Sequence, residues 1–189
     1  MTEATDKSAG AKKLVALSAL ILLAGLGACA SPANPAAMTV NAQDADRPFP
    51  QPFQRAMCVR NITGGEATNP LWVSKVDNAG FQSALSSSLG NMGLAAPGGD
   101  CAFPIDANLL GLAQPSIGFD FTVTSHVNYK VYDRAGQPVL LETVDAPFTA
   151  TMSDSLVAFE RLRIANEGAI RTSIQQFFNR LRETPAPAR

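Results

Sequence analysis

Residues 119–132 read FDFTVTSHVNYKVY, and apolar side chains occupy alternate positions along this stretch. The odd-numbered positions carry Phe, Val or Tyr, with Ser125 as the exception, whereas the even-numbered positions from 120 to 130 are all polar. A period of two sustained over this length predicts a β-strand with one buried face and one solvated face. The rest of the domain is expected to assemble on the buried face.

Three further strands are predicted around this one, over residues 56–62, 103–110 and 139–144. Met57, Val59 and Asn61 are expected to lie on the same side of the first. Gly136 turns the chain ahead of the last strand, which is therefore expected to run antiparallel to its predecessor. Pro147 is expected to end or bulge that last strand.

Two amphipathic helices are also predicted. The first runs from an N-cap at Asn78 to about Met92, and the second from an N-cap at Ser153 to about Arg182. Apolar residues recur at helical spacing in both: Phe81, Ala84, Leu85, Leu89 and Met92, then Leu156, Phe159, Leu162, Ala169, Ile170, Ile174, Phe177 and Leu181. Gly168 is expected on the opposite face of the second helix, where it costs about 1 kcal/mol relative to alanine.

The predicted order is therefore strand, helix, three strands, helix. One apolar sheet face and two amphipathic helices are most simply buried against each other as two layers. The fold class is predicted as α+β: a two-layer sandwich with both helices on one face of a mostly antiparallel sheet of about four strands.

The chain before residue 30 predicts where the protein is located. Lys12 and Lys13 precede an uncharged apolar run over residues 14–26, and the tripeptide Leu-Gly-Ala leads directly to Cys29. This order is typical of a secretory signal over residues 1–28. As a helix the apolar run is roughly 20 Å long, which is short of the roughly 30 Å that a permanent membrane span needs.

Leu-Gly-Ala-Cys resembles the lipobox of bacterial lipoproteins. The resemblance implies that the thiol of Cys29 receives a diacylglycerol, that the signal is cut before it, and that the protein is attached to a membrane through this anchor. Ala30, where enterobacterial inner-membrane lipoproteins have Asp, favours the outer membrane. Cleavage after Ala30, which would release a soluble protein, and an uncleaved anchor are the alternatives.

Composition divides the remaining chain. Residues 29–52 contain five prolines among Ala, Asn and Gln, which predicts a Pro/Ala-rich tether outside the core. Residues 53–183 are expected to form a single domain, long enough for one buried core. Residues 184–189 are expected to be a disordered tail.

With Cys29 lipidated, Cys58 and Cys101 remain as a pair in an oxidising compartment. A disulfide between them would close a loop of roughly 44 residues, for which the chain-entropy model gives about 4 kcal/mol of stabilisation. Two buried free thiols are the alternative. A metal site at these cysteines is not expected, because neither has a second Cys or His close by in the sequence.

The domain also resembles several groups of small envelope lipoproteins: the YajG-like group, auxiliary lipoproteins of transport systems, and the lipopolysaccharide-assembly lipoprotein. The likeness is carried by FQSALSSSL at residues 81–89 and RLRIANEGAI at residues 161–170, and it is one of hydrophobic spacing and element order. Members of such groups are non-enzymatic accessories, so the resemblance implies scaffolding or chaperoning work in the envelope.

No enzyme, metal or cofactor site is predicted. His126 is the only histidine, and nothing in the sequence provides the nucleophile that a catalytic base would need within hydrogen-bond reach. The formal net charge of −1 and the lack of a basic cluster with interleaved aromatics argue against nucleic acid as a partner.

A partner is instead expected on the polar side of the long strand, at Thr124, His126, Asn128, Lys130 and Tyr132. Asn166 falls inside the apolar stripe of the second helix, where an unsatisfied polar group would cost about 1–3 kcal/mol. It is expected either to fix the helix through hydrogen bonds or to contact a ligand. Three apolar residues lie off that stripe and form another candidate contact surface: Val157, Ile164 and Phe178.

The leading interpretation is a non-catalytic outer-membrane lipoprotein that binds an envelope protein or polymer. The alternative is a carrier of lipid or lipopolysaccharide, with an apolar cavity between helices and sheet lined by Phe81, Phe121 and Phe177.

Overall fold

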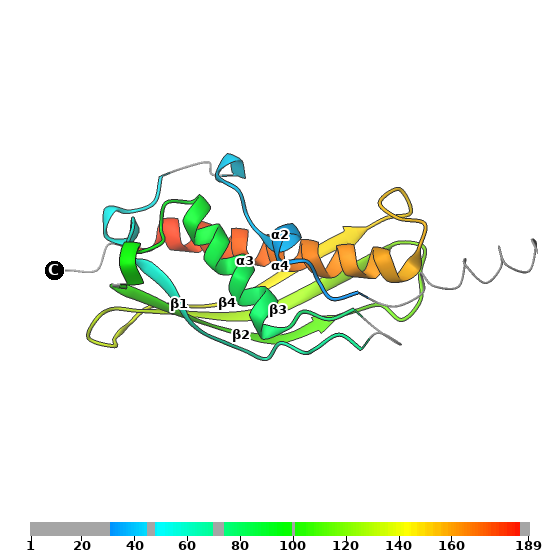
Figure 1. Ribbon diagram of the computed structural model, residues 1–189, viewed down its shortest axis with the longest axis horizontal. Helices are drawn as coiled ribbons and strands as arrows, with labels where there is room; N and C mark the ends of the chain where they lie inside the picture. The colour runs from blue at the N-terminus through cyan, green and yellow to red at the C-terminus, as the bar shows by residue number, and fades with distance from the viewer. Residues whose placement is uncertain (1–30, 45–47, 70–73, 100, 186–189) are drawn as a thin grey trace, which may run out of the picture.

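The computed structural model of the protein describes residues 31–44, 48–69, 74–99 and 101–185. Cys29, the predicted signal over residues 1–28 and the last four residues of the predicted tail lie outside these ranges. A four-stranded sheet in the order β1-β2-β3-β4 forms one layer, and the helices form the other (Figure 1). The predicted α+β sandwich and its element order are confirmed, with the short helix α2 (Pro35–Met38) as an addition.

The sheet is mixed. β1 (Met57–Thr63) pairs in parallel with β2 (Phe103–Ala113), and the other pairs are antiparallel. An irregularity between Val59 and Asn61 shifts the register of β1. The shift moves Ile62 into the core and leaves Asn61 exposed. The prediction that Asn61 lies on the same side as Met57 is therefore wrong, because period two does not continue through a bulge.

The alternating strand is β3 (Phe121–Tyr132), whose odd-numbered residues are all buried. Phe119 lies ahead of the strand and is exposed. β4 (Pro138–Ala150) is longer than predicted, and Pro147 lies within it opposite Thr124. Pro147 therefore does not end the strand. β4 is the edge of the sheet, where a residue without an N–H is tolerated.

The first helix, α3 (Asn78–Asn91), is capped by Asp77, whose carboxylate accepts a hydrogen bond from the Gly80 N–H at 2.6 Å. The predicted cap, Asn78, is the first helical residue, and its side chain instead accepts from the Gly65 N–H at 2.7 Å. The boundary is thus one residue off. The buried face of α3 matches the predicted stripe in Phe81, Ala84, Leu85 and Leu89.

The second helix, α4 (Ala158–Glu183), begins five residues later than predicted. Ser153 does not cap it, because Thr151 and Asp154 close a separate turn there through the Thr151 N–H and the Asp154 carboxylate at 2.7 Å. Leu156 and Phe159 consequently lie outside the core. Phe178 is buried rather than exposed, because Phe49 packs edge-on against it with ring centroids 5.8 Å apart.

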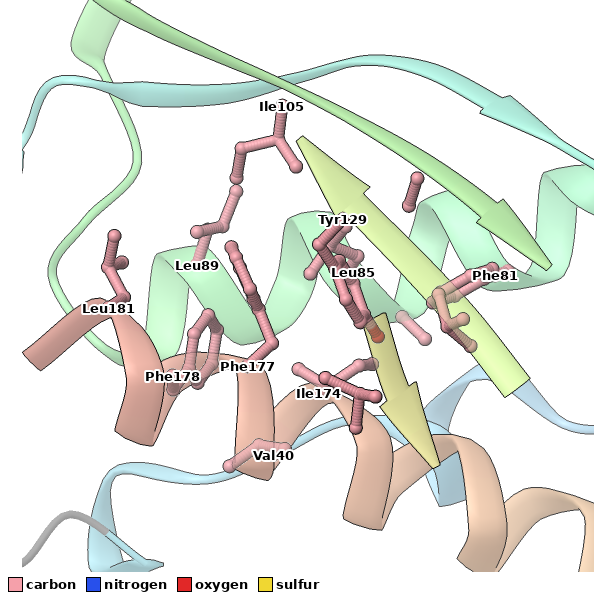
Figure 2. Close-up of a cluster of buried hydrophobic side chains, with 14 of the residues drawn as sticks. Val40, Phe81, Leu85, Leu89, Ile105, Tyr129, Ile174, Phe177, Phe178 and Leu181 are labelled. Carbon is pink, nitrogen blue, oxygen red and sulfur yellow. The ribbon is translucent and has the colours of Figure 1, made fainter. Parts of the chain in front are cut away.

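The main core fills the space between β3, α3 and α4 (Figure 2). Tyr129 of β3 is fully buried and stacks on Phe177 with ring centroids 4.4 Å apart, while Phe81 meets it edge-on at 6.4 Å. The Tyr129 hydroxyl lies 3.0 Å from the Ser173 hydroxyl. Burial raises the pKa of Tyr129 above its usual range, so the phenol stays neutral and acts as a hydrogen-bonding core residue.

α4 lies close to the sheet at Gly168. A Cβ at this position would overlap the ring of Phe148 on β4. Beside it, the Ser125 hydroxyl donates to the Ala169 carbonyl oxygen at 3.0 Å, which satisfies the one polar residue on the buried face of β3. Gly168 therefore faces the sheet rather than solvent, contrary to the prediction, and its missing side chain permits the contact.

Cys58 and Cys101 form a disulfide, which ties the start of β1 to the residue shortly before β2. The predicted pairing is confirmed. None of the helices within the described ranges has the length and apolar character that crossing a bilayer would require.

The contact at Gly168 predicts opposite effects for two glycine-to-alanine changes. Gly168→Ala gains about 1 kcal/mol of helix propensity but must displace Phe148, which costs about 1–3 kcal/mol in a packed site. We expect a net loss of up to about 2 kcal/mol in urea unfolding. Gly90→Ala in α3 meets no atom within 4 Å and is expected to stabilise by about 0.5–1 kcal/mol. A gain in both variants would contradict the close contact.

Candidate functional site

The candidate site is the sheet face opposite the helices, here called the open face. All three α-helices in the described part of the chain lie on the other face (Figure 1). β3 contributes the even-numbered residues of the alternating pattern, all of them exposed or half-buried: Thr122, Thr124, His126, Asn128, Lys130 and Tyr132. Five of the six residues predicted to bind a partner are therefore together on one surface.

Side chains on the open face pair across the strands. Asn128 donates to the Thr143 hydroxyl at 2.9 Å, and the Thr122 and Thr149 hydroxyls lie 2.8 Å apart. Such exposed cross-strand pairs each contribute roughly 0.2–1 kcal/mol. Their larger effect is to fix the positions of polar groups on the open face.

Arg60 and Asp106 extend this surface onto β1 and β2, and the sequence analysis missed both. The guanidinium of Arg60 contacts both Asp106 carboxylate oxygens, at 2.8 and 2.6 Å. It also lies over the Tyr132 ring, 4.6 Å from the centroid. The alternation within the second strand would have placed Asp106 on this face, but the position of Arg60 depends on strand pairing that the sequence does not reveal.

His126 pairs with Asp145 on β4, with Nδ1 and Oδ1 2.7 Å apart. Both side chains are substantially exposed, at 40% and 65%. Among the described contacts of His126 there is no Ser, Thr or Cys side chain that could serve as a nucleophile. The geometry is that of a cross-strand surface pair, which orients the imidazole toward solvent.

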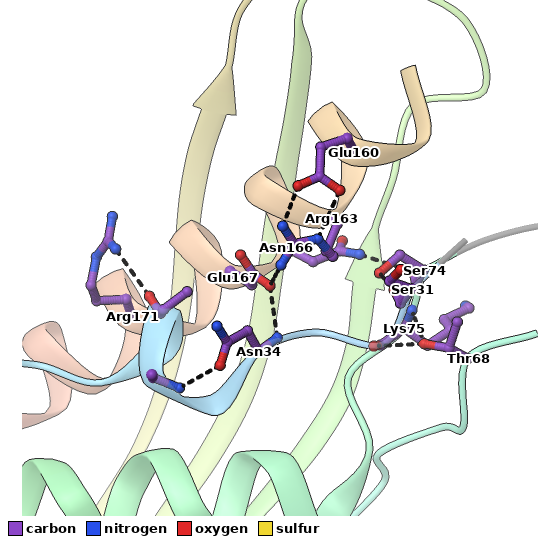
Figure 3. Close-up of polar contacts among 12 residues, drawn as sticks. Ser31, Asn34, Thr68, Ser74, Lys75, Glu160, Arg163, Asn166, Glu167 and Arg171 are labelled. Carbon is purple, nitrogen blue, oxygen red and sulfur yellow. Dashed lines mark hydrogen bonds and ion pairs between the residues drawn. The ribbon is translucent and has the colours of Figure 1, made fainter. Parts of the chain in front are cut away.

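Asn166 does not join the open face. It is fully buried on α4, where its amide donates to the Ser74 carbonyl at 2.9 Å and its Oδ1 accepts from the Gln114 side chain at 2.7 Å (Figure 3). Of the two expectations for this residue, the hydrogen-bonding role agrees with the geometry. A residue buried in this way cannot contact a partner directly, so its place among the contact residues is wrong.

The largest departure from the sequence analysis is at the N-terminal end of the described chain. Residues 31–43, here called the strap, lie across α3 and α4 rather than forming a tether (Figure 3). Met38 and Val40 are fully buried in the main core, and Phe49 beyond the strap is also buried. The predicted domain boundary at residue 53 is therefore wrong, because apolar side chains of this Pro/Ala-rich segment are part of the buried core.

Polar contacts fix the strap along its length. The Val40 N–H donates to the Ser88 hydroxyl of α3 at 2.9 Å, and Arg171 of α4 donates to the Ala37 carbonyl at 3.0 Å. At its beginning, the Ser31 carbonyl accepts from the Ser74 hydroxyl at 2.9 Å. Every backbone group engaged in this way resists release of the strap, since an unpaired buried group is costly.

Glu167 is the acidic group in this attachment. Its Oε1 accepts from the Asn34 N–H at 2.7 Å and from Arg163 at 2.6 Å. Burial raises the pKa of Glu167 above its usual value, and the Asn34 and Arg163 contacts offset part of that shift. Glu160, on the same arginine but more exposed, has its pKa lowered, mainly by the hydrogen bond from Arg163.

The apolar cavity of the alternative interpretation does not match the structure. Phe81 and Phe177 are packed around Tyr129 in the main core, whereas Phe121 belongs to a separate cluster with Leu162. The three residues predicted to line the cavity therefore do not lie around a common space. A half-open pocket beside Val76 holds only about 20 Å³, far less than an acyl chain requires. A wider groove between α2 and α3, of about 510 Å³, is shallow and mostly lined by polar residues: Asn34, Pro35, Ala36, Thr39, Asn41, Ser83 and Ser87.

Nothing in the described ranges suggests a metal centre either, since no three His, Cys, Asp or Glu side chains gather there.

Comparison with known proteins finds no matching family model and no matching curated protein. Among solved structures, the chain is similar to a candidate lipoprotein from Caulobacter crescentus CB15, with 14% identity, a TM-score of 0.46, and coverage of 70% of this chain and 95% of that one. A Xanthomonas campestris protein of the DUF330 family matches with 10% identity, a TM-score of 0.45, and coverage of 71% and 90%. A hypothetical protein from Chlamydia trachomatis matches with 13% identity, a TM-score of 0.43, and coverage of 69% and 92%. Similarities at this level of identity do not allow a function to be assigned to this chain.

The attachment of the strap predicts a pH dependence. A carboxyl whose pKa is raised on folding binds protons more tightly in the folded state, so its contribution to stability falls as pH rises from the ordinary carboxyl range through the raised pKa. Glu167→Gln removes that contribution. The free energy of unfolding of the variant, relative to that of wild type, should therefore increase as pH rises above the ordinary glutamate pKa of about 4.3.

Glu160→Gln is the matched control, because its pKa is shifted in the opposite direction. The contribution of Glu160 to wild-type stability is complete above the ordinary glutamate pKa and is lost as pH falls below it, so this variant should stay parallel to wild type above about pH 4.5 and gain stability relative to it at lower pH. Urea unfolding at several pH values measures both. Parallel curves for the two variants would contradict the assigned environments.

Proposed function

We propose that the protein is a lipid-anchored, non-catalytic lipoprotein of the bacterial cell envelope, and that it acts as an accessory or scaffold by binding an envelope protein or polymer. Cys29 carries the lipid, and the open face binds the partner. Ala30 after the cysteine favours the outer membrane as the site of anchoring.

The observation that supports this proposal best is the strap. The Leu-Gly-Ala-Cys sequence ends only two residues before Ser31, which is hydrogen-bonded to Ser74. A lipid on Cys29 would thus be attached to a folded domain almost without slack. The Cys58–Cys101 disulfide agrees with an oxidising compartment outside the cytoplasm.

The open face is suited to a polar partner. Its hydrogen-bonding groups are held in fixed positions by cross-strand pairs, which lowers the entropy lost on binding. Lys130 contributes an exposed cation, and Tyr132 adds an aromatic ring beneath Arg60. In this proposal the exposed His126–Asp145 pair serves recognition rather than catalysis. A substrate screen should detect no turnover with wild type or with His126→Ala.

Lipidation is tested by metabolic labelling with radioactive palmitate. Wild-type protein should incorporate label and lose residues 1–28, whereas Cys29→Ser should incorporate none and keep its signal segment. Equal labelling of the two, or an unlabelled wild-type protein starting at Ser31, would contradict the anchor and favour soluble secretion.

Partner binding is tested by in-cell photo-crosslinking from two surface positions on opposite sides of the domain. A benzophenone amino acid at Asn128 on the open face should capture a defined envelope component, identified by mass spectrometry, and one at Gln82 on α3 should not. Lys130→Glu is expected to reduce the yield by about fivefold to tenfold, the effect of losing one significant interface contact. Equal capture from both positions, or none from Asn128, would contradict a partner on this face.

A further inference from the structure

One end of the molecule carries a group of exposed apolar side chains that the fold does not use. Ile117 and Phe119, between β2 and β3, are 90% and 82% exposed, and Leu156, between β4 and α4, is 79% exposed. Val157 and Phe159 lie beside Leu156 and are also exposed. We call these five residues the apolar tip.

Strand pairing brings the two loops of the apolar tip to the same end of the sheet. Phe121 at the start of β3 pairs with Ala150 at the end of β4, so the residues just before the one and just after the other are neighbours. Figure 1 shows both loops at the end of the molecule opposite to the mark for the C-terminus.

Contacts inside the domain hold the loop between β4 and α4 in place. Arg161 is buried, donates to the Ser155 carbonyl at 2.7 Å, and lies over the Phe121 ring. Thr151 and Asp154 close a turn in the same loop. The apolar side chains are therefore held outward by a fixed framework, and groups of exposed apolar side chains mark contact surfaces.

The strap begins beside this tip. The Ser74 hydroxyl bonds to Ser31, and the Ser74 carbonyl accepts from Gln114, the residue directly after β2. Ile117 follows three residues later. Cys29 precedes Ser31 by two residues, which span at most about 7 Å when fully extended. A lipid at Cys29 would therefore enter its bilayer close to the apolar tip.

We propose that the apolar tip lies in the interface of the bilayer that holds the Cys29 lipid, so that the domain stands on the membrane at this end. The inference rests on the proposed lipid anchor. α4 begins at the tip and its 26 residues extend for about 39 Å, so the C-terminal end of the domain points away from the membrane.

Charge and area favour a bilayer over other occupants. The two loops contain Asp120 and Asp154 but no Lys or Arg, so the attraction is apolar and does not require anionic lipid. A stable dimer buries about 800 Å² per partner, which is more than a few side chains on two loops can offer.

The test uses the full, acylated protein in phosphatidylcholine vesicles, with a benzophenone amino acid at position 119 or 141. Leu141 is the matched control, because it is 59% exposed but lies nine residues before Ala150 on β4, about 30 Å from the tip. We expect radiolabelled lipid to be captured from position 119, while position 141 stays at background. Adding phosphatidylglycerol or salt should not increase the yield.

Ile117→Asp combined with Leu156→Asp should lower lipid capture at position 119 by about tenfold, the preference that one large buried apolar side chain provides. Leu141→Asp should leave it unchanged. Equal lipid capture at 119 and 141, a crosslink from 119 to a second copy of the chain, or capture that requires anionic lipid would each overturn the proposal. The mass of the protein, measured first, separates the two hypotheses: an unacylated product overturns the anchor and with it the tip contact, whereas equal capture by acylated protein overturns the tip contact alone.

Discussion

Four consecutive residues of α4 connect the helix to the strap, to the segment at Ser74 and to the sheet. Asn166 binds the Ser74 carbonyl and Gln114, Glu167 binds the strap at Asn34, Gly168 contacts Phe148, and the Ala169 carbonyl accepts from Ser125. The close contact at Gly168 lets the helix lie against the sheet, and this brings the Ala169 carbonyl within reach of the Ser125 hydroxyl on β3.

The contacts of the strap with α3, α4 and Ser74 give the N-terminal segment a structural role. A flexible tether would let the domain rotate freely above a membrane, whereas the strap leaves only Ala30 between Cys29 and Ser31, whose carbonyl is held by Ser74. A domain held so closely presents a defined end to the bilayer and a defined face to its surroundings. For an accessory protein, fixed orientation reduces the rotational freedom that must be lost when a partner binds.

The edges of the sheet bear on how such a partner could bind. β1 is bulged between Val59 and Asn61, and β4 contains Pro147. Both features discourage another strand from pairing along an edge. The open face, with its paired polar side chains, is therefore the part of the sheet most accessible to a specific contact.

The sequence by itself determined the layers, the strand order along the chain and the long β3 strand, because period two and period 3.6 are local signals. It named Cys58 and Cys101 as a candidate pair, and the structure decided between a disulfide and two free thiols. It also identified five of the residues on the open face, since alternation assigns them to the solvated side. Tertiary structure alone decided the inward position of Gly168, the bulge that exchanges Asn61 for Ile62, and the burial of Asn166, Phe178 and the strap. Each of these depends on which surface a distant segment meets. Met38 and Val40 show no periodicity in a proline-rich stretch, and only the groove between two helices makes them part of a core.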